Sequence, residues 1–487
     1  MKKYWLLLTM FVVLYVAYFS YLTVLRYKTL YSSYFDLGIM HQTVYNTFHA
    51  IKTGDYSRFL ELTNPHGYDQ IKRMAIHNDI LLVVVSLFYF IYSGPETLLV
   101  LQSVVLGLGA FALFGIAEHV LAKSKKKDLF SLLISLSYLL FPAMQRANVF
   151  DFHAVTLATS LLLFMFYFFL KKKYGWSYLF FVLSVLSKEE VALSTAFFGV
   201  YILFRERKSW KFGLSVLISS IIWFFVSMLI IIPAFRSSMH FALTYYSDFG
   251  DSPVSVIFGI LSHPTNIFKY MWRSDTLGYF LVLLGPAGFL SLLSPLQLFI
   301  VIPEFAINLL SNDWNMRNII YHYTSVITPF VFISAVYGFA EIEKRIIRIR
   351  SFKIDGGRIA LFSLVVCTIL FSYLKSPLPY SLERNVHPFL WPQKEAKDVQ
   401  TWNQILSNKK LKIMATGQIA PVFASRRYVY LFSARYDLAN YVVLSLNEIY
   451  NYPDRDILIP VYEKLIKDPS YMRIYKNENV EVYRKKI

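Results

Sequence analysis

The sequence is poor in charged residues and almost free of cysteine. Asp, Glu, Lys and Arg make up 16% of its 487 residues, whereas ordinary soluble domains carry about 25%. The one cysteine, Cys367, lies inside an apolar run, which excludes a disulfide framework and a cysteine-based zinc site. The glycine-rich nucleotide loops and the HExxH and GxSxG signatures are also absent. These absences argue against an ATP-driven transporter and a metalloprotease.

What the chain has instead is hydrophobic length. Hydrophobic residues make up 56% of it, and the mean hydropathy is +0.45. They come in runs of about 15–25 residues, the spacing of membrane spans rather than of a soluble core. A soluble enzyme, a nucleic-acid-binding protein and a disordered scaffold are therefore unlikely classes. The net charge of +18 does not indicate nucleic acid, because the basic residues cluster at the ends of apolar runs, where they orient helices.

The N-terminus predicts an uncleaved first span that starts in the cytoplasm. Lys2 and Lys3 precede an apolar run to about Leu25, which is longer than the core of a signal peptide. Further apolar segments follow along the chain, near residues 79–93, 96–121, 129–145, 154–170, 176–187, 191–204, 211–233, 279–293, 296–310, 324–342 and 358–374.

Basic clusters orient these segments, because Lys and Arg accumulate on the cytoplasmic side. The segment at 79–93 would make a helix of about 22 Å, against a hydrocarbon core of about 30 Å. If it does not span, every strong basic cluster falls inside. We therefore predict an interfacial helix there, eleven spans, a cytoplasmic N-terminus and an external C-terminus. The clusters are Lys123/Lys125/Lys126/Lys127, Lys171/Lys172/Lys173, Arg205/Arg207/Lys208/Lys211 and Lys344/Arg345/Arg348/Arg350/Lys353.

The segments at 176–187 and 191–204 are also short, and Lys188, Glu189 and Glu190 lie between them. A single long span would place these three charges in the middle of the membrane, where each is costly unless it faces a wet cavity. It would also move the next basic cluster outside. We therefore predict a hairpin of two short helices, with the charged triplet at the floor of an outward-facing cavity.

The chain changes character after Leu374. A proline-rich linker is followed by mixed polar and apolar sequence, which predicts strands at 411–416, 427–432 and 441–446, a helix at 456–467 and a closing hairpin at 472–484. The predicted organisation is a polytopic α-helical membrane domain over residues 1–374 and a small extracytoplasmic α/β domain over 375–487. Its external loop, 26–95, contains the interfacial helix at 79–93.

Polar residues at the predicted outer face form several candidate sites. Asp36 lies about ten residues after the first span, where a carboxylate can act as a base or bind a cation. It can equally cap the helix that follows it. His77 and Asp79 begin the interfacial helix, where capping by Asn78 or Asp79 is an equal alternative.

Three more candidates come later in the chain. Asp151 and His153 open the span at 154 and can serve as paired ligands or acid/base groups, or as a cap with an interfacial aromatic residue. Lys188, with Glu189 and Glu190, suits an anionic phosphate head group, and a structural ion pair is the alternative. The third candidate, a polar pair that can also be a membrane-interface anchor, is His322 and Tyr323.

The order of these motifs resembles a known family of prokaryotic polytopic membrane proteins, defined as a domain of unknown function and grouped with the GT-C superfamily of membrane glycosyltransferases. The motifs that carry the resemblance are FDLG (35–38), HND (77–79), DFH (151–153), KEE (188–190), HYTSVITP (322–329) and RRYVYLF (426–432). The resemblance covers most of the chain.

The GT-C resemblance implies a sugar donor linked to a polyprenyl phosphate or pyrophosphate, and transfer on the outer side of the membrane. It implies a catalytic carboxylate in the first external loop, which matches Asp36, and a second acid in the next external loop, which matches Asp151. Some members of the superfamily use a divalent metal. If a metal binds, its ligands here are Asp36, Asp151 and His153. Asp36 is followed by leucine rather than by a second acid, which puts metal dependence in doubt.

These inferences predict a glycosyltransferase of the cytoplasmic (inner) membrane. Asp36 is the candidate base, and a cation such as Lys188, Arg146 or Arg73 meets the leaving phosphate. Its partners are membrane lipids and a polyprenyl-linked sugar, with the acceptor open and no nucleic acid. The alternatives are a transporter or flippase of lipid-linked glycans, and a non-catalytic membrane protein whose outer domain binds a partner.

Overall fold

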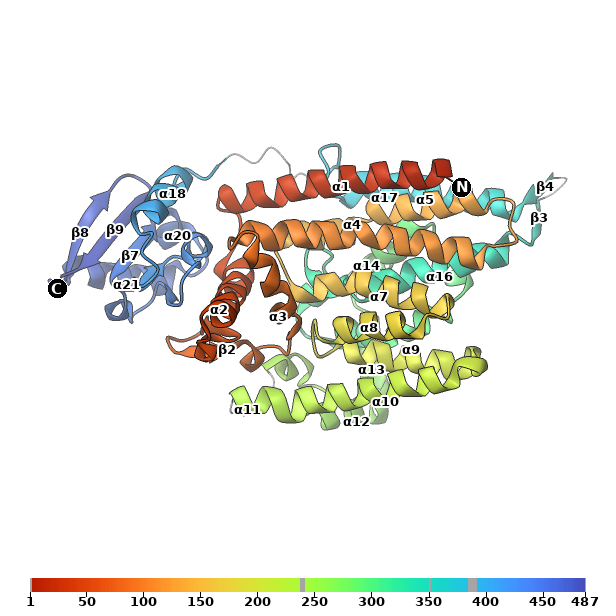
Figure 1. The fold of residues 1–487 in the computed structure, drawn as a ribbon, viewed down its shortest axis with the longest axis horizontal. Helices are drawn as coiled ribbons and strands as arrows, with labels where there is room; N and C mark the ends of the chain where they lie inside the picture. The colour runs from red at the N-terminus through yellow and green to blue at the C-terminus, as the bar shows by residue number, and fades with distance from the viewer. Residues whose placement is uncertain (1, 237–240, 350–351, 384–391, 487) are drawn as a thin grey trace.

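The chain folds into a long helical body with an α/β unit at one end (Figure 1). A computed structural model describes residues 2–236, 241–349, 352–383 and 392–486. The N-terminus lies at the end of the helical body opposite to the α/β unit. The two parts meet where α2 (Ile39–Thr53) and α3 (Leu81–Ser86) run across the axes of the long helices.

In the described part of the chain, five helical segments are long and apolar enough to cross a membrane. They are α1 (Lys2–Lys28); α4 (Pro95–Val120); α5 (Lys127–Leu139) with α6 (Pro142–Phe150); α10 (Trp210–Val226) with η6 (Ser227–Ile231) and α11 (Ile232–Arg236); and α17 (Gly356–Lys375). Shorter apolar helices include α7 (Ala154–Leu170), α8 (Tyr174–Val185), α9 (Val191–Arg205) and α16 (Ile327–Ile342). The count of eleven spans stays a prediction.

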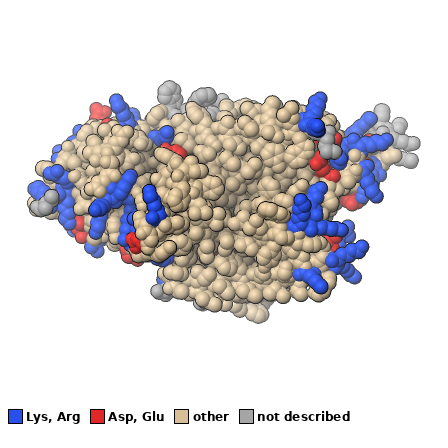
Figure 2. Space-filling view, viewed as in Figure 1, with Lys and Arg blue, Asp and Glu red and all other residues tan. Residues whose placement is uncertain are grey.

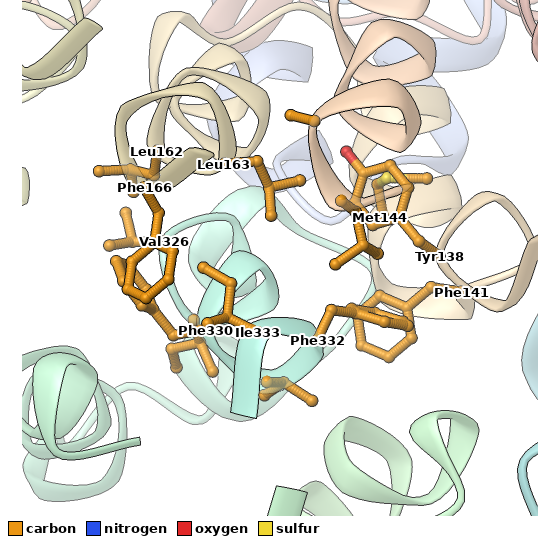
Figure 3. Close-up of a cluster of buried hydrophobic side chains, with 14 of the residues drawn as sticks. Tyr138, Phe141, Met144, Leu162, Leu163, Phe166, Val326, Phe330, Phe332 and Ile333 are labelled. Carbon is orange, nitrogen blue, oxygen red and sulfur yellow. The ribbon is translucent and has the colours of Figure 1, made fainter. Parts of the chain in front are cut away.

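The core of the helical body lies between α5, α6, α7 and α16 (Figure 3). The rings of Tyr138 and Phe141 contact the edge of Phe332, with centroids 5.6 and 5.2 Å apart. On α16, Gly338 lets the backbone of Leu290 approach so closely that an added Cβ would lie 1.9 Å from the Leu290 carbonyl oxygen. Lipid tails are as apolar as these side chains, so close packing holds such helices together.

On the face seen in Figure 2, charged side chains gather toward the two ends of the molecule and leave between them a broad belt with few Lys, Arg, Asp or Glu side chains. The basic clusters that follow α4, α7 and α9 lie at the end of the helical body where the chain begins (Figures 1 and 2). The predicted orientation requires that these basic clusters lie at the same end of the helical body. Which side of a membrane it faces stays a prediction.

The short apolar segments at 79–93, 176–187 and 191–204 form short helices, as their lengths predict. Residues 79–93 form α3 and a 3-10 turn, η4 (Leu87–Phe90), rather than a long helix. Helices α8 and α9 are separate and are joined by a turn at 186–190 that contains the charged triplet. This turn packs on the start of α3, because the N–H of Leu81 donates to the carbonyl of Leu186 at 2.8 Å.

Several elements differ from the sequence-based expectation. The apolar segment at 129–145 breaks where Pro142 begins α6, a position that proline favours. The segment at 279–293 is helical earlier, as α14 (Ser274–Leu284), and continues as 3-10 turns. Two helices lie where none was predicted, α12 (Pro253–Ser262) and α13 (Pro264–Met271). A small hairpin in the external loop joins β1 (Glu61–Thr63) and β2 (Gln70–Lys72).

The C-terminal part contains a five-stranded sheet in the order β6-β5-β7-β9-β8. The three predicted strands are present as β5 (Ile413–Ala415), β6 (Val429–Leu431) and β7 (Tyr441–Ser445), which run parallel. The predicted hairpin is β8 (Tyr471–Lys476) with β9 (Val480–Lys485), and the predicted helix is α21 (Arg455–Lys467). Shorter helices complete the unit: α18 (Ala396–Ile405), α19 (Ala420–Phe423) and α20 (Leu446–Asn451).

Candidate functional site

A cavity of about 700 Å³ lies where the segment between α1 and α4 meets the helical body. Most of the residues singled out from the sequence line it: Asp36, Arg73, His77, Asp79, His153, Lys188, Glu189, Glu190, His322 and Tyr323. The lining also has an apolar part, which includes Phe224 of α10, Met228 of η6, Val256 and Ile260 of α12, and Ile302 and Ile307 of α15 (Ile302–Leu310). The cavity is therefore amphiphilic, because charged groups and a hydrocarbon-like surface share its lining.

Asp36 lies in a single π-helical turn, η1 (Tyr34–Gly38). Such turns are rare and occur frequently at functional sites. The hydroxyl of Ser33 donates to Oδ2 of Asp36 at 2.7 Å, and Nε2 of His153 lies 3.3 Å from Oδ1. The Asp36 side chain is about a quarter exposed. It is therefore oriented by two neighbours and still open to a molecule in the cavity.

His153 and His322 stack face to face beside Asp36, with ring centroids 4.0 Å apart. Burial lowers the pKa of His322 well below its usual value, and the positive charge of the neighbouring Lys188 adds to this. The Nδ1 atoms of both rings are buried and find no hydrogen-bond partner among the described residues. The pair gives the cavity a neutral imidazole with unused hydrogen-bonding capacity.

Asp151 lies behind this wall, outside the lining of the cavity. Its Oδ1 accepts from the hydroxyl of Ser32 at 2.7 Å, and its Oδ2 accepts from the backbone N–H of Ser33 at 3.3 Å. Burial raises the pKa of Asp151 to about 7, against the opposing effect of the Arg26 guanidinium. The expectation that Asp151 shares the cavity with Asp36 is therefore not met, because its carboxylate is engaged with the segment that precedes Asp36.

The backbone of Asp151 is strained. Its φ is +146°, a region in which residues other than glycine cost about 1–3 kcal/mol. Gln102 of α4 holds this conformation: its Nε2 donates to the Asp151 carbonyl, and its Oε1 accepts from the N–H of His153, both at 3.0 Å. The strained backbone of Asp151 therefore lowers the stability of the fold, while the two hydrogen bonds of Gln102 fix the link between Asp151 and His153.

The charged triplet between α8 and α9 reaches the floor of the cavity. Nζ of Lys188 lies 2.9 Å from Glu190 and 5.9 Å from the centre of the Tyr323 ring. Glu189 accepts from the N–H of Asn78 at 2.9 Å and lies 2.8 Å from Nδ1 of His77. Lys188 and Glu190 therefore form an ion pair inside the cavity, while Glu189 ties the turn to the external segment.

Arg73 is an almost fully buried part of the cavity wall. Its Nε contacts both carboxylate oxygens of Asp79, at 3.0 and 2.9 Å. Its Nη1 is buried and has no hydrogen-bond partner within the described residues. A buried guanidinium nitrogen without an acceptor is suited to an anion.

Arg146, which the sequence suggested as a phosphate ligand, lies elsewhere. Its guanidinium is bound by the carboxylate of Glu383 and the carbonyl of Lys375, at the end of α17. Helix α6 begins at Pro142 and turns this side chain toward the linker after α17, away from the residues that line the cavity. The prediction that Arg146 binds substrate is therefore not supported by its position.

The sequence left the presence of a divalent metal open. Within the described residues, no three His, Cys, Asp or Glu side chains are grouped as a metal ion would require. Asp36 and His153 are close to one another, but both oxygens of Asp151 are occupied by Ser32 and Ser33. The proposed ligand set therefore does not fit a metal, and no step of the chemistry below uses one.

Comparisons with known proteins agree with this architecture. Residues 26–476 match DUF2079, a family described as predicted membrane proteins. No curated protein matches the chain. The structure is similar to that of ArnT from Cupriavidus metallidurans bound to undecaprenyl phosphate, with a TM-score of 0.53 and 11% identity, and to apo ArnT, with 0.52 and 12%. Each likeness covers 99% of this chain and 98% of ArnT.

At this identity the likeness to ArnT concerns the fold alone, whereas the match to a family of predicted membrane proteins confirms the family resemblance inferred from the sequence motifs. The family match covers most of the chain, so the protein belongs to the DUF2079 family of predicted membrane proteins.

Proposed function

We propose that this protein is a glycosyltransferase that moves a sugar from a polyprenyl-phosphate-linked donor to an acceptor at the outer face of the cytoplasmic membrane. One observation carries the proposal: an accessible carboxylate, Asp36, and a buried guanidinium with an unpaired nitrogen, Arg73, line one cavity together with many apolar side chains. A lipid-linked sugar phosphate has three parts that match these groups. The acceptor that attacks its sugar needs a base, its phosphate needs a cation, and its hydrocarbon chain needs an apolar surface.

Asp36 acts as the base in this proposal. Its carboxylate takes the proton of an acceptor hydroxyl while the acceptor oxygen forms a bond to the anomeric carbon of the sugar. The bond between that carbon and the phosphate oxygen breaks, and the electron pair leaves with the phosphate on the polyprenyl chain. Ser33 and His153 orient the Asp36 carboxylate through the contacts described above. Asp151 fixes the segment that contains Ser33, which makes it a positioning residue rather than a second base.

The leaving phosphate gains negative charge, which a preorganised cation stabilises more strongly in a water-poor cavity than in water. Arg73 is held in place by Asp79 and offers its Nη1. Lys188 is a second cation in the lining, shared with Glu190. His77, His322 and Tyr323 complete the polar wall, against which the sugar hydroxyl groups bind in this proposal.

The apolar lining suits the lipid part of the donor. Helix α12 and the η6 turn present Val256, Ile260 and Met228 to the cavity. The similar ArnT structure was determined with bound undecaprenyl phosphate, which supports a polyprenyl phosphate as ligand here. In the proposed orientation the N-terminus is cytoplasmic, and the cavity and the C-terminal α/β unit face away from the cytosol. The sugar and the acceptor stay open.

The test is mass spectrometry of lipid-linked glycans in cells that lack the protein. A polyprenyl-phosphate-linked sugar should accumulate in the deletion strain and return to its ordinary level when the wild-type gene is restored.

Asp36→Asn should reach the membrane in normal amount and still leave the lipid-linked sugar accumulated, because removal of a general base lowers the rate by about 10²–10⁴-fold. Asp69→Asn, an exposed carboxylate of the same external loop, is the matched control and should complement. Full complementation by Asp36→Asn would contradict the base assignment. If no lipid-linked species changed on deletion, the whole proposal would fail.

A further inference from the structure

The π turn that presents Asp36 is tied to the C-terminal α/β unit through one peptide group. The backbone N–H of Tyr34, the first residue of η1, donates to the carbonyl of Gly417 at 3.0 Å. The N–H of the same peptide group belongs to Gln418, and it donates to Oε2 of Glu448 at 2.8 Å. Glu448, on α20 of the C-terminal unit, is thus one peptide group away from the turn that contains Asp36.

The first N–H groups of a helical turn have no partner within the turn and must find one elsewhere. Two N–H groups at the start of this turn do so on opposite sides. That of Ser33 is taken by Asp151, from the link between α6 and α7, and that of Tyr34 is taken by Gly417, from the C-terminal unit. Asp36 is therefore held between two parts of the protein that are far apart in the sequence.

The side chain of Tyr34 strengthens the second attachment. It is completely buried, and its hydroxyl donates to Oε1 of Gln42 at 2.9 Å, with the carbonyl of Val429 on β6 at 3.3 Å. Gln393, which precedes α18, adds a further tie, because its Nε2 contacts the carbonyl of Leu30 at 2.9 Å and Oε1 of Gln418 at 2.8 Å. The contact between the turn and the C-terminal unit is thus buried and extensively hydrogen-bonded.

Glu448 is an unusual residue at this place. It is 5% exposed, and its Oε1 has no hydrogen-bond partner among the described residues. Burial raises its pKa to about 7, the Thr416 hydroxyl and the Gln418 N–H oppose the rise, and the neighbouring Glu395 adds to it. Keeping a carboxylate in such surroundings costs stability, which an exposed position would avoid.

We propose that Glu448 is a positioning residue for Asp36, because it polarises the Gly417–Gln418 peptide that holds the N–H of Tyr34. A hydrogen bond to a charged carboxylate is roughly twice as strong as a neutral one, and consecutive hydrogen bonds through one peptide reinforce each other. Through this peptide, the C-terminal unit keeps the π turn ordered. The consequence for catalysis rests on the proposed role of Asp36, whereas the test below does not.

The test is hydrogen–deuterium exchange of the purified full-length protein in detergent, with mass spectrometry of peptides covering residues 31–40 and the strands β5 and β7. Glu448→Ala should raise the exchange rate of Tyr34–Gly38 by up to about tenfold, the factor expected if the turn opens whenever the Gly417–Gln418 peptide has lost its hydrogen bond to a charged group. Glu448→Gln keeps a neutral acceptor of the same reach and should give an exchange rate between those of the wild type and Glu448→Ala, because a hydrogen bond to a neutral group is roughly half as strong. The control is Glu463→Ala, an exposed glutamate of α21, which should leave all peptides unchanged.

Three results would overturn the proposal. Exchange of Tyr34–Gly38 could be the same in Glu448→Ala as in the wild type. The strands β5 and β7 could lose protection together with the turn, which would make Glu448 a general stabiliser of the C-terminal unit. Glu448→Gln could exchange at the turn as slowly as the wild type, which would mean that the charge of Glu448 has no part in ordering it. Because exchange is measured without substrate, these outcomes are distinguishable from failure of the proposed glycosyltransferase activity.

Discussion

Arg73 binds Asp79 through Nε alone, which contacts both carboxylate oxygens, while Nη1 of the same guanidinium is buried and without a partner in the described residues. The usual pairing of arginine and carboxylate uses two nitrogens, one for each oxygen. Here the carboxylate fixes the guanidinium plane and leaves another edge unpaired. A buried donor without an acceptor is costly, and an anion bound at that edge removes the cost.

Arg73→Lys should weaken the binding of a polyprenyl phosphate about tenfold or more. Lysine keeps the charge, but one ammonium group cannot both satisfy Asp79 and present a donor to the phosphate in fixed geometry. Native mass spectrometry of the purified protein titrated with polyprenyl phosphate measures the affinity directly. Lysine is preferable to a neutral residue, because loss of the charge would leave Asp79 buried and unpaired at a cost of about 3–5 kcal/mol.

Arg427→Lys is the matched control for this titration. Arg427 also pairs with a carboxylate, that of Glu61, through Nε and Nη2 at 2.9 and 3.0 Å, but it does not line the cavity. The affinity of this variant for polyprenyl phosphate should equal that of the wild type. Equal weakening in both variants would show that Arg73 has no special part in binding the phosphate.

Local sequence signals are sufficient to locate most of the site. The short apolar run at 79–93, the charges between two short helices and the FDLG and DFH motifs each depend on residues close together in the chain. The strands β5, β6 and β7 are recognisable because β-branched and aromatic residues are concentrated there between turn residues. Helix α12 carries a local signal of the same kind, since Ser252 forms a capping box and Pro253 stands at the first helical position.

Contacts between distant residues cannot be predicted in this way. Ser32 and Asp151 are 119 residues apart, and no local pattern shows that one holds the other. The sequence offered Arg146 as a cation for the leaving phosphate, yet the direction of α6 brings it to Glu383. The tie between Tyr34 and Gly417 joins segments from opposite ends of the sequence. Such relations depend on how complete elements pack, which a single sequence does not specify.

The stability of the protein should fall as the pH drops below about 6.5, in part because of His41. Burial lowers its pKa to about 3, while Nδ1 lies 2.6 Å from the Tyr89 hydroxyl and Nε2 lies 2.8 Å from that of Ser425. An unfolded histidine has a pKa of about 6.5, so between pH 6.5 and 3 the unfolded state binds one proton more than the folded state. His41 then contributes a loss of up to about 1.4 kcal/mol for each pH unit.

His41→Gln removes this titration and should flatten the dependence. Unfolding midpoints of the purified protein at pH 7.5 and pH 5 measure it, with the exposed His66→Gln as a control that keeps the wild-type slope. If His41→Gln lost as much stability between these two pH values as the wild type, protonation of His41 would not be the cause.

Gly338 should be among the least replaceable glycines of the helical body. A Cβ at this position would lie 1.9 Å from the carbonyl oxygen of Leu290, a backbone atom that cannot turn aside, so Gly338→Ala must push α16 away from η9 (Leu290–Leu293). Overpacking of this kind costs about 1–3 kcal/mol.

Gly278→Ala provides the opposite case for the same substitution. Gly278 also lies within a helix, α14, but an added Cβ meets no atom within 4 Å, so the change should raise stability by about 0.5–1 kcal/mol, because alanine loses less conformational freedom in a helix. Thermal unfolding of the two purified variants in detergent should therefore shift in opposite directions. A shift in the same direction for both would mean that helix propensity, rather than the contact between α16 and η9, governs the effect of these substitutions.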